Sequence, residues 1–138
     1  MTKEEVKELV VSYNQNYDEQ LKAIQTYLKT HPSVFIDTVM YDEFYGDYAL
    51  CDENMEYRDP RTIKDYCYIN VELLGHRRRV KAIGMTLNDN DKDISVWYMM
   101  DSVICDMPLS HVCKRDYVDL LWLLSEADDY EIAFKCEE

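Results

Sequence analysis

The fold is decided by residues 66–100, which read YCYINVELLGHRRRVKAIGMTLNDNDKDISVWYMM. Apolar and polar residues alternate over 67–73, as they do in a strand with one buried face. The Gly75-His76 pair predicts a turn, and the apolar run 80–87 predicts a second strand that forms a hairpin with the first. Residues 94–100 are apolar on both faces, which is typical of a strand in the middle of a sheet.

Further strands are predicted on both sides of this stretch. β-branched and aromatic residues favour a strand over 34–41, followed by a long loop, and residues 103–106 form a short strand before Pro108. Alternation over 130–136 predicts a closing edge strand. Within the second strand of the central hairpin, Gly84 indicates a bulge or a close backbone approach.

Two helices flank these strands in the sequence. A Thr-x-x-Glu capping box begins a long helix predicted over 2–30, along which apolar residues recur every three or four positions. The polar run 14–16 is the point at which this helix could divide in two. Ser110 is the expected cap of a second helix that reaches Glu126.

These elements predict a single α+β domain over residues 1–138. In it, a long N-terminal helix and a C-terminal helix pack on a mainly antiparallel sheet of about four to six strands. The 138-residue length suits one domain, and the 47% hydrophobic content suits one core. No apolar run approaches the roughly 20 residues that a membrane span needs.

The cysteines and the first residues bear on the compartment. Five cysteines without framework spacing fit a reducing environment, and residues 1–8 show no secretory signal. We therefore expect a cytoplasmic protein. Cys67 falls at an alternating apolar position, where a cysteine usually behaves as a small buried hydrophobe.

Charge is the most unusual property of the chain. It carries 28 acidic side chains against 15 basic ones, which gives a net charge of −13. A surplus of this size attracts cationic surfaces over long range and opposes direct binding to DNA. Residues 32–60 are strongly acidic and rich in tyrosine, which supplies rigid contact area. The expected partner-binding residues are Asp42, Glu43, Tyr45, Asp47, Tyr48, Asp52 and Glu53.

We therefore expect a non-enzymatic, acidic protein-binding module that masks a basic, nucleic-acid-binding surface of a partner. Anti-defence inhibitors from phages or mobile elements, and toxin-immunity proteins, are the corresponding kinds of protein. No cofactor, no direct DNA binding and no membrane association are expected. A third hypothesis is self-association through the N-terminal helix.

The alternative function is a small enzyme or an anion-ligand-binding domain. Residues 61–87 are the one basic segment, and Arg77, Arg78 and Arg79 stand together within it. Guanidinium groups suit phosphate and carboxylate ligands, and a histidine nearby, His76 or His111, would complete such a site. A second interpretation is that these arginines balance the acids of 42–59 within the same molecule, each exposed pair contributing little stability.

Two metal-like patterns are incomplete. Residues 89–93 resemble the start of a calcium loop, but Ile94 stands where glycine is needed and Met100 stands where a bidentate glutamate belongs. Three soft ligands lie close in sequence but lack a fourth for zinc: Cys105, His111 and Cys113. No metal site is predicted.

Overall fold

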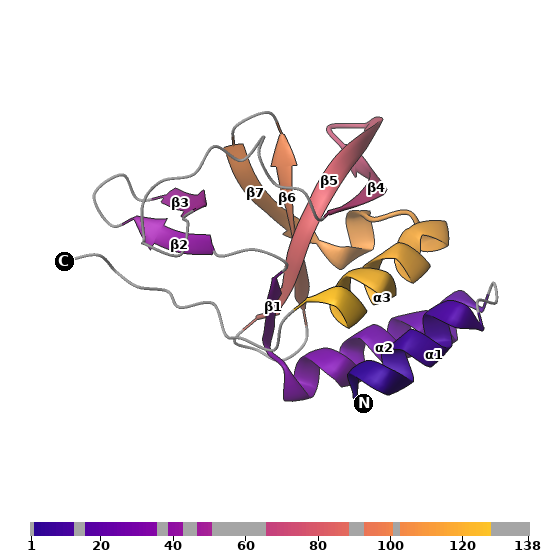
Figure 1. Ribbon diagram of the computed structural model, residues 1–138. Helices are drawn as coiled ribbons and strands as arrows, with labels where there is room; N and C mark the ends of the chain where they lie inside the picture. The colour runs from indigo at the N-terminus through magenta and orange to yellow at the C-terminus, as the bar shows by residue number, and fades with distance from the viewer. Residues whose placement is uncertain are drawn as a thin grey trace.

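The computed structural model describes residues 2–12, 16–35, 39–42, 47–50, 66–88, 93–100 and 103–127. Within these ranges, three helices cover one face of an antiparallel sheet, and a separate two-stranded sheet lies on the other side (Figure 1). The predicted α+β class is confirmed. None of the described helices combines the length and the apolar character that a membrane crossing requires.

The N-terminal helical region consists of two helices, α1 (Lys3–Val11) and α2 (Tyr17–Thr30). Thr2 caps α1, because its Oγ1 accepts a hydrogen bond from the Glu5 backbone N–H at 3.2 Å, as the capping box predicts. The prediction of one long helix is wrong. Asn16 Oδ1 accepts a hydrogen bond from the Glu19 backbone N–H at 3.2 Å, and this strong N-cap begins a new helix at the polar run.

The main sheet contains β1 (Ser33–Phe35), β4 (Cys67–Leu73), β5 (His76–Leu87), β6 (Ile94–Met100) and β7 (Val103–Pro108). Both β4 and β1 pair with one edge of β5, while β6 pairs with the other edge and with β7. Every pairing is antiparallel. Six of the seven residues of β6 are buried, which confirms the predicted central strand.

The turn of the central hairpin lies one residue earlier than predicted. Leu74 and Gly75 form it, and both have positive φ, 51° and 79°. This combination matches the type I′ turn that suits the twist of a two-residue hairpin. Because both residues of the turn adopt this conformation, β5 begins at His76 and is longer than the predicted strand.

Gly84 fulfils both parts of its prediction. The register between β5 and β6 shifts between Ala82 and Gly84, which marks the bulge. A Cβ atom added to Gly84 would lie 2.5 Å from the carbonyl oxygen of Val34 and 2.6 Å from a ring carbon of Phe35. The absence of a side chain at Gly84 therefore lets β1 approach the bulge closely.

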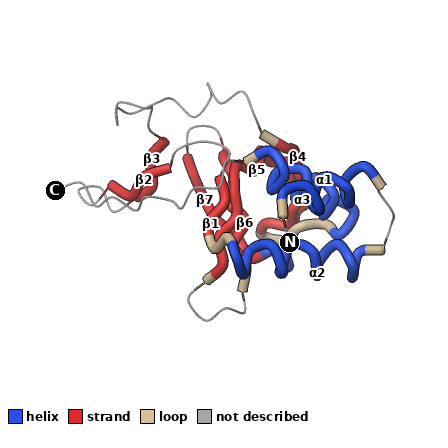
Figure 2. Tube along the Cα trace, turned by 60° about the horizontal axis from the view of Figure 1, so that its bottom comes forward, coloured by secondary structure: helices blue, strands red, loops and turns tan. Residues whose placement is uncertain are grey.

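The predicted strand over 34–41 is divided in the structure. Its first part is β1, and its last part belongs to β2 (Val39–Asp42), which pairs with β3 (Asp47–Leu50) in the predicted loop. β-propensity alone does not determine which partner each half of such a run takes. Two views agree that the β2–β3 hairpin lies on the side of the main sheet away from the helices (Figures 1 and 2).

The predicted start of the C-terminal helix is also wrong. Two 3-10 turns, η2 (Leu109–His111) and η3 (Lys114–Asp116), precede α3 (Tyr117–Glu126). Between them, Val112 forms a bridge with Val71, and the Cys113 N–H donates to the Asn70 carbonyl at 2.9 Å. The segment after Ser110 therefore covers the outer edge of β4 before the helix begins. The predicted strand over 130–136 lies outside the described residues.

The main core lies between the helices and the sheet, and a smaller apolar cluster lies on the opposite face of the sheet. The cluster contains Phe35, Ile83, Trp97, Met99 and Ile104. In the main core, Tyr27 is fully buried, so this part of the apolar stripe of the first helices covers the protein's own core. Cys67 is buried there, as predicted. Its burial, followed by the charges of Asp119 and Asp116, raises the pKa of the thiol to about 12.

Candidate functional site

The hairpin of β4 and β5 extends beyond the rest of the main sheet. β6 pairs with residues 81–87 of β5, whereas residues 76–82 pair with β4 (Figure 1). Leu74 at the turn is 99% exposed. We call this projection the cationic arm. Its basic and tyrosine residues are Tyr66, Tyr68, Arg77, Arg78, Arg79 and Lys81, and its one acidic residue is Glu72.

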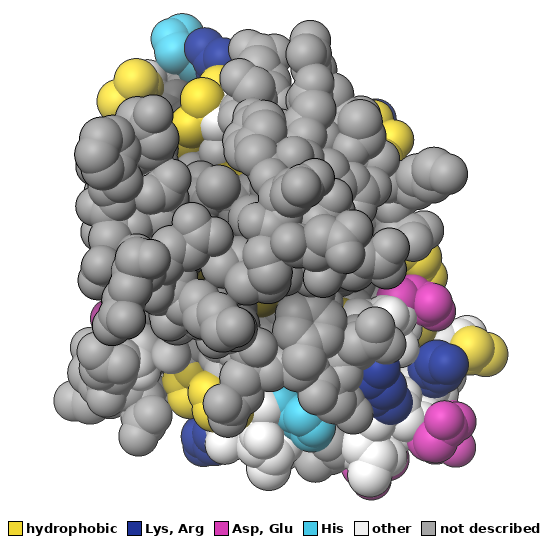
Figure 3. Space-filling view, turned by 60° about the vertical axis from the view of Figure 1, so that its left-hand side comes forward, with side chains coloured by type: hydrophobic (Ala, Val, Ile, Leu, Met, Phe, Trp, Pro, Cys, Tyr) yellow, Lys and Arg dark blue, Asp and Glu magenta, His cyan; other side chains and the backbone are white. Residues whose placement is uncertain are grey.

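The strand register divides the basic residues of the cationic arm between two faces. Glu72 pairs with Arg77, Asn70 with Arg79, and Tyr68 with Lys81. Side chains alternate between the two faces of a strand. Arg77, Arg79 and Lys81 therefore share one face of β5, and Arg78 lies on the other face. All three arginines are exposed. Figure 3 shows basic and histidine side chains at the end of the molecule where Figure 1 places this turn.

Two of these cations lie over tyrosine rings. The Arg79 guanidinium carbon is 4.4 Å from the centroid of the Tyr68 ring, and Lys81 Nζ is 4.5 Å from that of Tyr66. The two rings meet edge to face at 5.1 Å, and the Tyr68 hydroxyl donates to the Tyr66 hydroxyl at 3.4 Å. The cation–π contacts therefore hold both positive charges at defined positions, Arg79 on an exposed surface and Lys81 at a half-buried one.

The positive charge of the cationic arm also affects the pKa of an acidic residue in α3. Burial and the neighbouring Asp116 raise the pKa of Asp119, while the positive charge of Arg79 lowers it. Asp116 itself accepts hydrogen bonds from the backbone N–H of Asn70 at 2.8 Å and from Asn70 Nδ2 at 3.1 Å. These bonds fasten the segment before α3 to the edge of β4.

The β2–β3 hairpin, here called the acidic hairpin, contains part of the predicted partner-binding set. Its register pairs Asp42 with Asp47 and Tyr41 with Tyr48. Acidic residues at directly paired positions repel one another. The remaining members of the predicted set lie outside the described residues: Glu43, Tyr45, Asp52 and Glu53.

The acidic hairpin and the cationic arm lie in different parts of the molecule. The acidic hairpin lies on the side of the main sheet away from the helices, whereas the arm is the end of the sheet that carries the turn between β4 and β5 (Figures 1 and 2). The interpretation that Arg77, Arg78 and Arg79 balance the acids of 42–59 stays a prediction, because most of those acids lie outside the described residues. The acidic hairpin and the cationic arm belong to two separate sheets.

The histidines of the alternative site are both exposed. His76 begins β5 at the turn of the cationic arm, and His111 ends η2. Cys105 contacts Tyr98, whose pKa is raised by burial and by this contact. Among the described residues, no three histidine, cysteine or acidic side chains gather as metal ligands, and Cys105, His111 and Cys113 are not brought together. The calcium-like residues 89–92 lie outside the described ranges.

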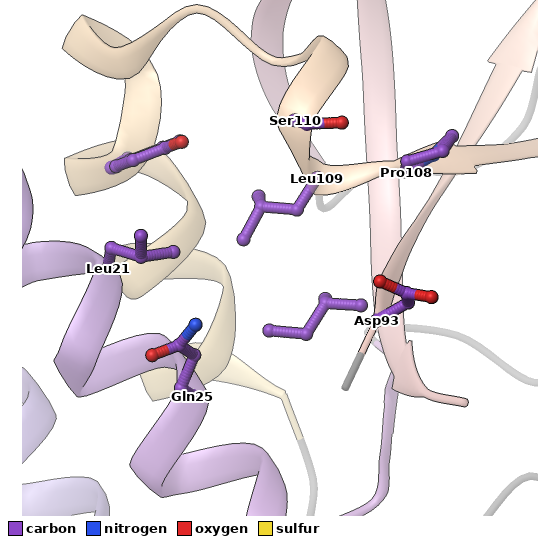
Figure 4. A pocket seen from close by; sticks show the side chains of 8 residues that line it. Leu21, Gln25, Asp93, Pro108, Leu109 and Ser110 are labelled. Atoms are coloured by element: carbon purple, nitrogen blue, oxygen red, sulfur yellow. The ribbon is translucent and has the colours of Figure 1, made fainter. Parts of the chain in front are cut away.

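A pocket of about 220 Å³ lies between α2 and the ends of β6 and β7. Leu21 and Gln25 project from α2 toward Leu109, with Asp93 and Ser110 at the rim (Figure 4). Ligand pockets usually measure roughly 300–1,000 Å³. This pocket is thus smaller than most ligand pockets.

Comparison of the chain with models of protein families, with curated proteins and with solved structures gives no match.

Proposed function

We propose that the protein is a cytoplasmic, non-enzymatic binding module whose acidic hairpin masks a basic surface of a partner protein. The observation that carries this proposal is the register that pairs Asp42 with Asp47 in a chain of net charge −13. Two acids at paired positions weaken their own hairpin. A lysine or arginine of a partner placed beside both would remove that repulsion, so binding and hairpin stability are coupled.

The chemistry of the surface favours one class of partner. Basic surfaces that attract arrays of negative charge are typical of proteins that bind nucleic-acid phosphates. A compact acidic protein that occupies such a surface inhibits its owner by excluding the nucleic acid. Anti-defence inhibition or toxin immunity are the corresponding biological roles. The same net charge opposes direct binding of this protein to DNA.

Tyrosines accompany the acids in the acidic hairpin. Tyr41 and Tyr48 occupy the pair of positions next to Asp42 and Asp47. Tyrosine buries a large rigid surface and provides a hydroxyl, which is why it is frequent in interfaces. We therefore assign the aromatic pair to the contact area and the acidic pair to attraction and orientation of the basic partner.

The test uses the double variant Asp42→Asn/Asp47→Asn and the matched control Glu4→Gln/Glu8→Gln. Glu4 and Glu8 are exposed on α1, so the control removes the same charge elsewhere. Immobilised protein captures partners from lysate at low and high salt. A captured protein is identified by mass spectrometry, purified, and titrated against each variant by calorimetry.

We expect a basic partner whose capture weakens with salt, because exposed charges are screened. The hairpin variant should lose about tenfold or more in affinity, and the α1 control should lose much less. The hairpin variant should also be the more stable protein when it is unbound, since its internal repulsion is gone. Equal affinity of both variants for the purified partner, or binding that ignores salt, would disprove the proposal.

A further inference from the structure

The basic residues of the cationic arm form a regular row. Arg77, Arg79 and Lys81 occupy every second position of β5 on one face. Residues of an antiparallel strand rise by about 3.4 Å each, so neighbours in this row are about 6.8 Å apart along the strand. An extended peptide repeats its side chains on one face at this same interval.

We propose that the cationic arm is a binding site for an extended acidic segment of another protein, with carboxylates on alternate residues. Each carboxylate of such a segment would face one cation of the row. This inference goes beyond the proposed function, because it concerns a ligand of opposite charge on a different surface of the molecule.

The tyrosine contacts prepare the row for binding. Arg79 and Lys81 already lie over Tyr68 and Tyr66, at 4.4 and 4.5 Å from the ring centroids. A guanidinium or ammonium group that is held in place loses less conformational freedom when it binds an oxyanion. A guanidinium group also binds a carboxylate through two parallel N–H donors. The arm therefore offers preorganised carboxylate partners on an exposed strand.

The charges elsewhere in the molecule favour a short acidic segment over a nucleic acid. Residues 66–81 contain four basic side chains and one acidic side chain, a net charge of +3, and the rest of the chain therefore carries −16. A long polyanion would extend past the arm into this negative field. In addition, Arg79 and Lys81 cover tyrosine faces on which bases would otherwise stack.

The experiment compares two fluorescein-labelled peptides of identical composition, Glu-Ser-Glu-Ser-Glu and Glu-Glu-Glu-Ser-Ser, by fluorescence anisotropy at low salt. A thymidine pentanucleotide and inorganic phosphate serve as competitors. The protein variants are Arg79→Gln, Tyr68→Leu and Arg78→Gln. Arg78→Gln is the matched control, because it removes the same charge from the adjacent residue on the other face. Circular dichroism checks that each variant is folded.

We expect the alternating peptide to bind more tightly than its isomer. Arg79→Gln should weaken the affinity for the alternating peptide by about tenfold. Tyr68→Leu should weaken this affinity less, and Arg78→Gln should weaken it much less than Arg79→Gln does. Equal affinity of the two peptides, equal loss in Arg78→Gln and Arg79→Gln, or stronger binding of the pentanucleotide or of phosphate would overturn the inference. Asp42→Asn/Asp47→Asn should change peptide affinity no more than Glu4→Gln/Glu8→Gln does, so this result is independent of the basic-partner test.

Discussion

The cationic arm and the acidic hairpin are both two-stranded antiparallel units, but they pair their residues in opposite ways. Across the arm, Glu72 faces Arg77, and cations lie over tyrosine rings. Across the acidic hairpin, Asp42 faces Asp47 and Tyr41 faces Tyr48. The register of the first places opposite charges at paired positions, whereas the register of the second places like charges at paired positions. In the function proposed above, a basic partner would supply the positive charge that this pairing lacks.

The two hairpins also differ in how they are anchored. Ile69, Val71 and Val80 of the arm's strands belong to the main core, and the segment before α3 covers the outer edge of β4. The acidic hairpin forms a sheet separate from the main one. An isolated two-stranded hairpin is marginally stable in water. Interaction with a partner should therefore stabilise the acidic hairpin more than the arm.

The largest expected effect is on the packing of β1 against the bulge in β5. In Gly84→Ala, the new methyl group would meet the Val34 carbonyl oxygen at 2.5 Å and the Phe35 ring at 2.6 Å, and the backbone oxygen has no rotamer in which to withdraw. We expect a loss of about 3 kcal/mol in the free energy of unfolding, measured by urea denaturation. Equal stability to wild type would show that β1 is not held against the bulge.

Gly75→Ala is the control for this substitution. No heavy atom lies within 4 Å of the added Cβ, so its cost comes from the positive φ of 79° alone. That cost is about 1–2 kcal/mol. If Gly84→Ala costs no more than Gly75→Ala, steric contact with β1 does not explain the glycine at position 84.

Two charge reversals exchange the charge pairing of the two hairpins, so that like charges are paired in the arm and opposite charges are paired in the acidic hairpin. Arg77→Glu places two acids opposite each other in the arm, and Asp47→Lys places opposite charges in the acidic hairpin. We expect the first to destabilise the protein and the second to stabilise it, each by up to about 1 kcal/mol. Thermal and urea unfolding measure both changes.

Matched controls separate these pairings from the change in net charge. Arg78→Glu changes net charge as Arg77→Glu does, but residue 78 is paired with Val71. Asp106→Lys changes the net charge by the same amount as Asp47→Lys. Asp106 is exposed on β7, and it is paired with Trp97 and not with an acidic residue. If each reversal and its control have the same effect, overall repulsion accounts for the result and the contrast between the hairpins disappears.

The residue pattern predicted the central strands because burial imposes it directly. Alternation over 67–73 and the apolar run 94–100 follow from contact with the core, and Gly84 follows from a backbone approach that excludes any side chain. The surface of the arm was not predictable in the same way. Its cation–tyrosine contacts depend on register, and the actual turn at Leu74 and Gly75 lies one residue before the predicted one. A slip of one residue moves every side chain to the opposite face.

The sequence of the acidic hairpin contains a mirrored order of residue types, which strand propensity does not take into account. In the sequence, Tyr41 and Asp42 are mirrored by Asp47 and Tyr48 on the two sides of residues 43–46, and the structure pairs these mirrored positions. The start of α3 had no such signal. Its position depends on the bridge between Val112 and Val71, which are distant in sequence. Contacts of this kind arise from tertiary packing and leave no local pattern.

The smallest expected effect concerns Asp119 of α3, whose pKa is lowered by the charge of Arg79 in the arm. The pKa of Asp119 is raised above its ordinary value of 3.8 in the folded protein, chiefly by burial. The folded protein therefore keeps a proton that the unfolded chain has released, and it loses stability as pH rises from 3.8 through the folded pKa. Asp119→Asn removes this cost. We expect it to be more stable than wild type at neutral pH by less than about 1 kcal/mol, because solvent screens the half-exposed carboxylate.

The pH dependence and a second substitution test this cause. The gain from Asp119→Asn, measured by thermal unfolding across pH, should disappear below pH 3.8, where Asp119 is protonated in both states. Arg79 lowers the pKa of Asp119, so the gain should be larger in an Arg79→Gln background. An equal gain in both backgrounds would mean that the charge of Arg79 acts only on the outer face of the arm, where the acidic ligand is proposed to bind.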